Sequence, residues 1–279
     1  MEEEMVIRLN NIPFAVVTGG SSGIGKALAI LLARGGSSVA IVARNEAKLA
    51  EAKTQVEAVK ASGAFVAIAR ADTTNEGQVK DAFDTLVAEH GVPSHLFNCV
   101  GAANPGYIQA FSITDYEEAM KTNYMGTVIP TMALLPRFID RGSGHVVNTS
   151  SAGGFVGIIG YATYSPAKFA VIGFSEVLRH ELKPRGIKVS VACPPDTSTP
   201  GFDEENKKKP EECKIISQHG KLLQPEAVAS AILDGVKRGT FLILPGESGF
   251  MYTMKRLFPG LVQRIIDNDL RRARKRMGK

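Results

Sequence analysis

The stretch that decides the fold is Phe14-Ala-Val-Val-Thr-Gly-Gly-Ser-Ser-Gly-Ile-Gly25, followed by residues 26–34. It begins with a short apolar run typical of a buried strand, and the residues after it have helical character. Between the two lie Gly19, Gly23 and Gly25. Glycines here let the backbone turn tightly and approach a pyrophosphate, which the N-terminus of the helix attracts. Because strand and helix are both present, we interpret the segment as a dinucleotide-binding loop rather than a simple turn.

Apolar strand-like runs and helical stretches alternate along the rest of the chain. Further strands are expected at 39–42, 64–69, 96–99, 145–148, 188–192 and 241–244, and helices at 46–60, 73–90, from 114, at 164–182 and from 225. Thr73 with Glu76, and Thr114 with Glu117, have capping-box spacing and are expected to begin two of these helices. This alternation predicts an α/β fold, a Rossmann-type doubly wound parallel sheet of about seven strands.

Composition describes an ordinary globular chain of 279 residues, 44% hydrophobic and 22% charged. No linker or repeat divides it, which favours one domain at 1–249 with a basic amphipathic helical extension at 250–279. Three scattered cysteines favour a reducing compartment and do not form a metal-binding pattern, so we expect no metal. The acidic N-terminus does not resemble a targeting signal. We therefore expect a cytoplasmic protein, with peripheral contact to a membrane surface as an addition.

Two partner classes are not indicated by the sequence. A membrane-spanning helix needs about 20 predominantly apolar residues, and no stretch meets that requirement. The net charge is +5, with many of the basic residues at 271–279. Such a tail is most often a solvated end, and no aromatic platform or zinc-finger spacing accompanies it. We therefore expect no nucleic-acid partner.

The end of the second expected strand indicates which dinucleotide the loop binds. A carboxylate there holds the ribose hydroxyls of NAD, whereas an arginine accommodates a 2′-phosphate. The chain has Val42-Ala-Arg44 and no acid, so we expect NADPH/NADP; the alternative is that Arg44 is solvated. Ser21 or Ser22 would add hydroxyl contacts. Asp72 fits either a bond to the adenine amine or a cap of the following helix.

Four polar residues form a candidate catalytic set. Tyr164 and Lys168 are four apart and share one face at the start of a helix. A phenol titrates near pH 10, and a neighbouring ammonium is expected to lower the pKa of Tyr164 toward a usable range. Ser151, just after a strand, is placed to donate a hydrogen bond to a substrate oxygen. Asn123, within a long helix, is a candidate to hold a water that relays protons to Lys168.

These motifs resemble those of the short-chain dehydrogenase/reductase family over nearly the whole chain. The matching segments are Thr18-Gly-x-x-x-Gly-Ile-Gly25, Asn98-Cys-Val-Gly101, Asn123, Ser151, Tyr164 and Lys168, while Pro194-Pro195 replaces the family's usual Pro-Gly. The resemblance implies catalysis by those four side chains and a homo-oligomer, a dimer or tetramer. The cofactor-binding residues that motifs and resemblance together indicate are Gly19, Ser21, Ser22, Gly23, Ile24, Gly25, Arg44, Asp72, Asn98, Gly101, Tyr164, Lys168, Pro194, Thr197 and Thr199.

The segment from Pro194 to Asn206, followed by Lys209-Pro-Glu-Glu212, resembles one branch of that family, the 3-ketodihydrosphingosine reductases. The resemblance implies NADPH-dependent reduction of 3-ketodihydrosphingosine to dihydrosphingosine, a step of sphingolipid synthesis. Another lipophilic carbonyl, such as a 3-oxoacyl thioester or a steroid, stays open as the substrate. A non-catalytic NADPH-binding regulator is a third possibility, against which the intact catalytic set argues.

Two segments lie outside the predicted sheet. Residues 195–224 are too long for a tight turn and are expected to form a substrate lid, the alternative being a solvated loop with a charged run at Lys207 to Lys209. Glu204 or Glu205 in this segment is a candidate to attract a substrate ammonium. After residue 249, apolar residues recur at mostly helical spacing beside basic ones. Packing on the domain or on a second copy explains such a stripe more often than membrane docking, which stays an alternative.

Overall fold

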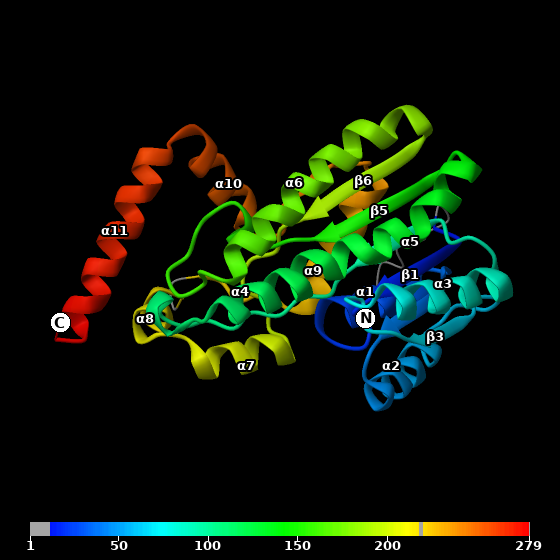
Figure 1. Cartoon of the computed structure of the whole chain (residues 1–279), viewed down its shortest axis with the longest axis horizontal. Coiled ribbons are helices and arrows are strands. Elements are labelled where there is room, and N and C mark those ends of the chain that lie inside the picture. The colour runs from blue at the N-terminus through cyan, green and yellow to red at the C-terminus, as the bar shows by residue number, and fades with distance from the viewer. Residues whose placement is uncertain (1–11, 218–219, 279) are drawn as a thin grey trace, which may run out of the picture.

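The computed structural model describes residues 12–217 and 220–278 and confirms the predicted fold class (Figure 1). Seven parallel strands form one sheet in the order β3-β2-β1-β4-β5-β6-β7. The strands are β1 (Phe14–Thr18), β2 (Ser38–Ala43), β3 (Val66–Arg70), β4 (His95–Asn98), β5 (Gly144–Thr149), β6 (Ile187–Ala192) and β7 (Leu242–Ile243). The strand order reverses between β1 and β4, and a crevice at the carboxyl ends of the strands is expected at such a switch point.

Helices cover both faces of this sheet. The α-helices of the described residues are α1 (Gly23–Arg34), α2 (Glu46–Glu57), α3 (Glu76–His90), α4 (Ile113–Met120), α5 (Gly126–Arg141), α6 (Tyr164–Leu182), α7 (Pro200–Lys208), α8 (Glu211–Ser217), α9 (Pro225–Lys237), α10 (Ser248–Leu257) and α11 (Pro259–Arg276). One core layer joins Leu32 of α1 and Leu233 of α9 to Val17 of β1. The other joins Phe83 of α3 and Phe138 of α5 to the opposite face of the same strands. The core therefore lies in two layers, and the edge where strands end is left for a site.

The two predicted capping boxes are wrong in position. Asn75, not Thr73, caps α3, because its side-chain oxygen accepts a hydrogen bond from the backbone of Gln78. Helix α4 begins at Ile113, one residue before Thr114, and its N-cap Ser112 forms a capping box with Asp115. In each case a stronger or equal N-cap residue lies directly beside the first helical turn. The expected helices themselves are present.

The predicted lid and the C-terminal extension are both helical. Residues 195–224 contain α7 and α8, and the chain after β7 forms α10 and α11. In Figure 1, α11 lies on the side of α8, far from α1 and α3. It packs against α8, where Arg274 Nε lies 3.8 Å from Glu212 Oε1, and Ala273 is fully buried. The boundary at residue 249 and the lid role stay predictions.

No helix within residues 12–217 and 220–278 combines the length and the apolar character needed to cross a bilayer.

Two buried histidines predict how stability depends on pH. His95 and His145 are neighbours on β4 and β5. Burial lowers the pKa of His95 to about 4 and that of His145 to about 3. In the unfolded chain a histidine titrates near 6.5, so protons favour the unfolded state as the pH falls below about 6.5. The free energy of unfolding should fall by about 2 to 3 kcal/mol per histidine between pH 7 and pH 4.5.

Urea unfolding across this pH range tests the prediction. His145→Gln, which keeps a polar group near Ser190 Oγ, should recover about 2 kcal/mol of the loss at pH 4.5. His180→Gln, on the exposed surface of α6, should keep the wild-type pH dependence. An unchanged pH dependence in His145→Gln would contradict the assignment.

Candidate active site

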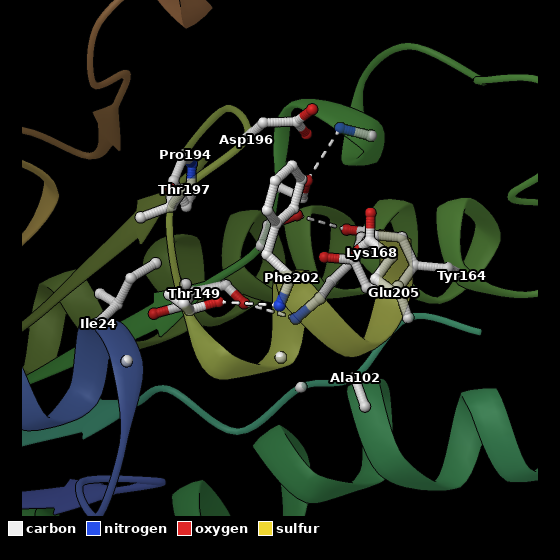
Figure 2. A pocket seen from close by; sticks show the side chains of 18 of the residues that line it. Ile24, Ala102, Thr149, Tyr164, Lys168, Pro194, Asp196, Thr197, Phe202 and Glu205 are labelled. Atoms are coloured by element: carbon white, nitrogen blue, oxygen red, sulfur yellow. Dashed lines mark hydrogen bonds between the residues drawn. The ribbon is translucent and has the colours of Figure 1, made fainter. Parts of the chain in front are cut away.

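One cavity of about 890 Å³ lies at the carboxyl ends of the strands. Its wall begins at the loop between β1 and α1, passes the ends of β2 to β6, and ends at α7, α8, α10 and α11. Figure 2 shows Ile24 on the side of the β1 loop, Tyr164 and Lys168 on α6, and Phe202 and Glu205 on α7. The cavity thus joins the predicted cofactor end to the predicted catalytic end.

The glycine loop leaves no room for side chains where it turns. Gly19 has φ +69, and a Cβ there would lie 3.0 Å from the backbone of Cys99. A Cβ on Gly25 would lie 2.4 Å from the carbonyl oxygen of Gly19, which no real side chain tolerates. Ser22 is the N-cap of α1, yet its side chain makes no capping bond, so the first backbone N–H groups of α1 are left for another acceptor. This cradle fits a pyrophosphate.

The adenosine end of the cavity carries the predicted Arg44 and Asp72. Burial acts to raise the pKa of Asp72, but hydrogen bonds from the backbone and hydroxyl of Thr74, with the charge of Arg44, hold it below its ordinary value. Asp72 therefore does not cap α3, a role taken by Asn75. Lys48 and Lys121 line the same wall and were not singled out from the sequence. The three basic side chains suit a phosphate.

Asn98 does not lie on the cavity wall. It is fully buried, its Oδ1 accepts a hydrogen bond from Thr18 at 3.2 Å, and its Nδ2 donates to Thr131 and Asn148 at 3.0 Å each. These bonds join the ends of β1, β4 and β5 to α5. The predicted cofactor contact of Asn98 is therefore corrected to a structural one, because its side chain is directed into the sheet edge.

The remaining predicted cofactor residues do line the cavity. They are Gly19, Ser21, Ser22, Gly23, Ile24, Gly25, Arg44, Asp72, Gly101, Tyr164, Lys168, Pro194, Thr197 and Thr199. Thr199 approaches the glycine loop closely, since a Cβ on Gly23 would lie 3.1 Å from its methyl group. The segment after β6 and the loop after β1 thus enclose the cavity from two sides.

Tyr164 and Lys168 project from the first two turns of α6. Lys168 is buried, its Nζ donates a hydrogen bond to the carbonyl oxygen of Thr149 at 3.0 Å, and it lies 5.7 Å from the centre of the Tyr164 ring. A Cβ on Gly101 would meet this ammonium at 2.8 Å. Ser151 follows β5, and its Oγ accepts a hydrogen bond from Gly153 at 3.1 Å. All three predicted groups share the cavity wall.

Burial shifts the two titrating groups in opposite directions. It lowers the pKa of Lys168 to about 8. It raises the pKa of Tyr164, and the charges of Glu205 and Asp196 add to the rise, while the Ser151 hydroxyl acts to lower it. The sequence predicted that Lys168 lowers the pKa of Tyr164. That prediction is wrong for this structure, because the ammonium is directed to Thr149 and desolvation of the phenol dominates.

Asn123 lies on a π-helical turn, Lys121–Met125, between α4 and α5. It is fully buried, its Oδ1 accepts from the backbone of Ala102, and its Nδ2 donates to the carbonyl oxygens of Ala102 and Ala119. A Cβ on Gly101 would meet Oδ1 at 3.0 Å, so Asn123 supports the strip of backbone against which Lys168 lies. Its side chain thus fixes that strip, and the predicted water relay stays a prediction.

The far end of the cavity is apolar with an acidic rim, and several of its residues were not predicted. Apolar residues lining it are Val156, Ile158, Ile159, Phe202, Ile216, Met251 and Ile266. Met251 and Ile266 belong to the C-terminal helices, whose apolar spacing indicated a buried face but not its target. Of the two proposed ammonium ligands, Glu204 pairs with Lys207, and Glu205 accepts a hydrogen bond from Tyr161 and pairs with Lys209.

Comparison with known proteins agrees with this geometry. A family model described as short chain dehydrogenase matches residues 13–210. The 3-dehydrosphinganine reductase of Danio rerio is 39% identical over 238 residues, which cover 85% of this chain and 72% of that protein. The 3-ketodihydrosphingosine reductase of Bos taurus is 38% identical over the same shares. That of Dictyostelium discoideum is 39% identical over 243 residues, 82% of this chain and 73% of that protein.

Solved structures give the same result for the fold. A short chain dehydrogenase/reductase from Burkholderia phymatum in complex with NAD has a TM-score of 0.78 at 25% identity, covering 90% of this chain and 94% of that one. A short-chain dehydrogenase from Sphingobium yanoikuyae in complex with NADPH has a TM-score of 0.75 at 25% identity, covering 90% and 95%.

Arg44 provides a test of the cofactor end. Reversing its charge with Arg44→Glu should weaken NADPH binding by about 10- to 100-fold, since a charge-assisted hydrogen bond contributes about 1.5–3 kcal/mol. NADH binding should not weaken to the same degree. Calorimetric titration measures both. Lys53→Glu, on α2 outside the cavity, is the matched control and should keep wild-type affinity. Equal affinity of Arg44→Glu and wild type for NADPH would contradict the assignment.

Proposed function

The chain belongs to the short-chain dehydrogenase family, and we propose that it reduces 3-ketodihydrosphingosine to dihydrosphingosine with NADPH. One observation carries the proposal: a single cavity joins the glycine loop to Tyr164 and continues into an apolar end. The first part suits a dinucleotide, the second a carbonyl, and the third a long alkyl chain. The names of the relatives from Danio rerio and Bos taurus supply the substrate.

The cofactor is held by the residues described above. The glycine loop and the N-terminus of α1 bind the pyrophosphate, and Arg44 binds the 2′-phosphate that distinguishes NADPH from NADH. Lys168, beside Gly101, binds the ribose next to the nicotinamide. When bound, NADPH supplies the hydride for the ketone carbon.

The chain's own residues bind the ketone oxygen and supply the proton that this oxygen receives. Ser151 donates a hydrogen bond to the ketone oxygen and stabilises the negative charge that develops on it. Tyr164 gives its phenolic proton to the same oxygen, which completes the secondary alcohol and leaves a phenolate. The ammonium of Lys168 is directed to the carbonyl oxygen of Thr149 and holds the cavity wall beside Tyr164. Asn123 positions the Gly101 and Ala102 backbone against which Lys168 lies. Tyr164 is protonated at neutral pH, as a phenol is, so it carries a proton to donate in the direction of reduction.

We also propose that the protein forms a homo-oligomer, a dimer or tetramer, as the family resemblance implies. In support, apolar side chains on α5 and α6 are exposed: Met132 at 51%, Phe169 at 45% and Val177 at 54%. A second copy that packs on these helices would remove them from water.

We further propose that the C-terminal helices contact a membrane surface. Exposed apolar side chains on and between α10 and α11 are Phe250, Leu257, Phe258, Leu261 and Ile265, and basic side chains accompany them. A basic amphipathic face of this kind binds anionic headgroups and inserts its apolar residues between them. Because Met251 and Ile266 of the same helices line the cavity, a lipophilic substrate would enter from the surface that these helices touch.

The enzymatic proposal is tested by NADPH oxidation with the purified full chain. We expect turnover of 3-ketodihydrosphingosine and much slower turnover of a 3-oxoacyl thioester or with NADH. Tyr164→Phe removes the proton donor and should lower kcat by at least about 100-fold. Tyr116→Phe, on α4 outside the cavity, should keep wild-type rates. Full activity of Tyr164→Phe would contradict the mechanism. NADPH binding without turnover of the sphingoid ketone would contradict the substrate assignment alone.

The membrane proposal is tested by vesicle flotation. The triple substitution Leu257→Ser, Phe258→Ser and Leu261→Ser should reduce binding to vesicles rich in phosphatidylserine by at least about 10-fold, because it removes apolar area that inserts. Ile113→Ser, an exposed apolar residue on α4, is the matched control. Binding that survives the triple substitution, or that is absent in the wild type, would contradict a docking role of these helices.

A further inference from the structure

Three polar side chains, those of Tyr161, Glu205 and Lys209, meet where α7 packs on the domain and take no part in the chemistry proposed above. The hydroxyl of Tyr161 donates a hydrogen bond to the carboxylate of Glu205. Lys209, at the end of α7, places its Nζ 3.1 Å from Glu205 Oε1 and 3.9 Å from Asp196 Oδ2. The same ammonium lies 4.1 Å from the centre of the Phe202 ring. Glu205 and Phe202 line the cavity, and Lys209 lies behind them.

This cluster is buried, and its burial strengthens the attraction that holds its side chains in place. The side chain of Lys209 is 1% exposed and that of Glu205 is 15% exposed, so water screens their attraction little. Removing one partner from a buried ion pair leaves an uncompensated charge and is strongly destabilising. By contrast, Lys207 and Glu204 on the same helix pair at 66% and 69% exposure, where a pair contributes little. Lys209 and Glu205 therefore fix where α7 lies.

The cluster is joined to the catalytic tyrosine. Tyr161 precedes α6, its carbonyl oxygen accepts a hydrogen bond from the backbone of Ser165 at 2.9 Å, and its ring centre lies 6.0 Å from that of Tyr164. The charge of Glu205 also acts on the phenol of Tyr164. A shift of α7 would therefore displace the first turn of α6, which carries Tyr164.

Several charged or titratable groups face the phenol of Tyr164 from different elements. Lys168 comes from its own helix, Cys193 and Asp196 from the segment after β6, and Glu205 from α7, with the Ser151 hydroxyl after β5. Glu205 and Asp196 act to raise the pKa of Tyr164. Lys209 carries the opposite charge and lies against both of these carboxylates.

We propose that Tyr161, Glu205 and Lys209 are positioning residues for the reaction: together they hold α7 against the cavity wall and set the charge that faces the phenol of Tyr164. The inference rests on the proposed role of Tyr164 as the proton donor. Glu205 is consequently occupied by Tyr161 and Lys209 rather than available as a ligand for a substrate ammonium.

The test follows oxidation of dihydrosphingosine with NADP⁺ across pH, where the rate rises as Tyr164 loses its proton. Glu205→Gln removes a negative charge and should move the rise to lower pH by about one unit, whereas Lys209→Met should move it to higher pH by about one unit. Asp203→Asn and Lys207→Met remove the same charges from exposed positions on α7 and should leave the profile in place. Every variant meets the same substrate, so ionisation of the substrate affects all profiles equally.

Further variants keep the test decisive if Lys209→Met does not fold. The double variant Glu205→Gln/Lys209→Met removes one charge of each sign, and its profile should return to within about 0.3 units of wild type. Lys209→Arg keeps the positive charge, and its pH profile should also match that of wild type. Shifts of equal sign in the two single variants, or none, would overturn the inference while Tyr164→Phe remains inactive. Activity of Tyr164→Phe would overturn the proposed function instead.

Discussion

The site depends on one buried ammonium, that of Lys168. Its hydrogen bond to the carbonyl oxygen of Thr149 joins α6 to the end of β5, and its position against Gly101 joins both to the segment after β4. A Cβ at Gly101 would displace this ammonium, which explains why that position holds a glycine. Asn123 fixes the neighbouring backbone from below through Ala102. Three segments that are far apart in sequence are thereby held at one place on the sheet edge.

Burial of the two titrating groups explains their opposite pKa shifts. An ammonium loses solvation when it is buried and so titrates at lower pH, while a phenol loses solvation on ionising and so titrates at higher pH. The pKa of Lys168 falls to about 8 and that of Tyr164 rises. The protein therefore holds Tyr164 in its protonated form, and the Ser151 hydroxyl is the group that opposes this shift. The sheet edge positions the side chains of Lys168 and Tyr164, and their desolvation in the cavity shifts their pKa values.

The sequence was sufficient wherever a local pattern determines the structure. The strands, the glycine loop and the helix from Tyr164 to Leu182 follow from apolar runs, turn residues and helical spacing, and the pair Tyr164 and Lys168 follows from that helix. It was insufficient wherever a choice between near-equal neighbours mattered. Asn75 and Ser112 cap helices that Thr73 and Thr114 were expected to begin, because several good N-cap residues lie within one turn. The inward direction of Asn98 needed the positions of Thr131 and Asn148.

The run from Lys207 to Lys209 shows the same limit in a way that bears on function. Its composition indicates a solvated face, and Lys207 does lie in solvent. Helix α7 turns by about 100° per residue, so Lys209 falls on the face of Glu205 rather than that of its neighbours and enters the protein. There it opposes the charges of two carboxylates that face Tyr164. Lys168 of α6 lines the cavity beside Tyr164, whereas Lys209 lies behind the cavity wall and acts on the site through the two carboxylates that it pairs with.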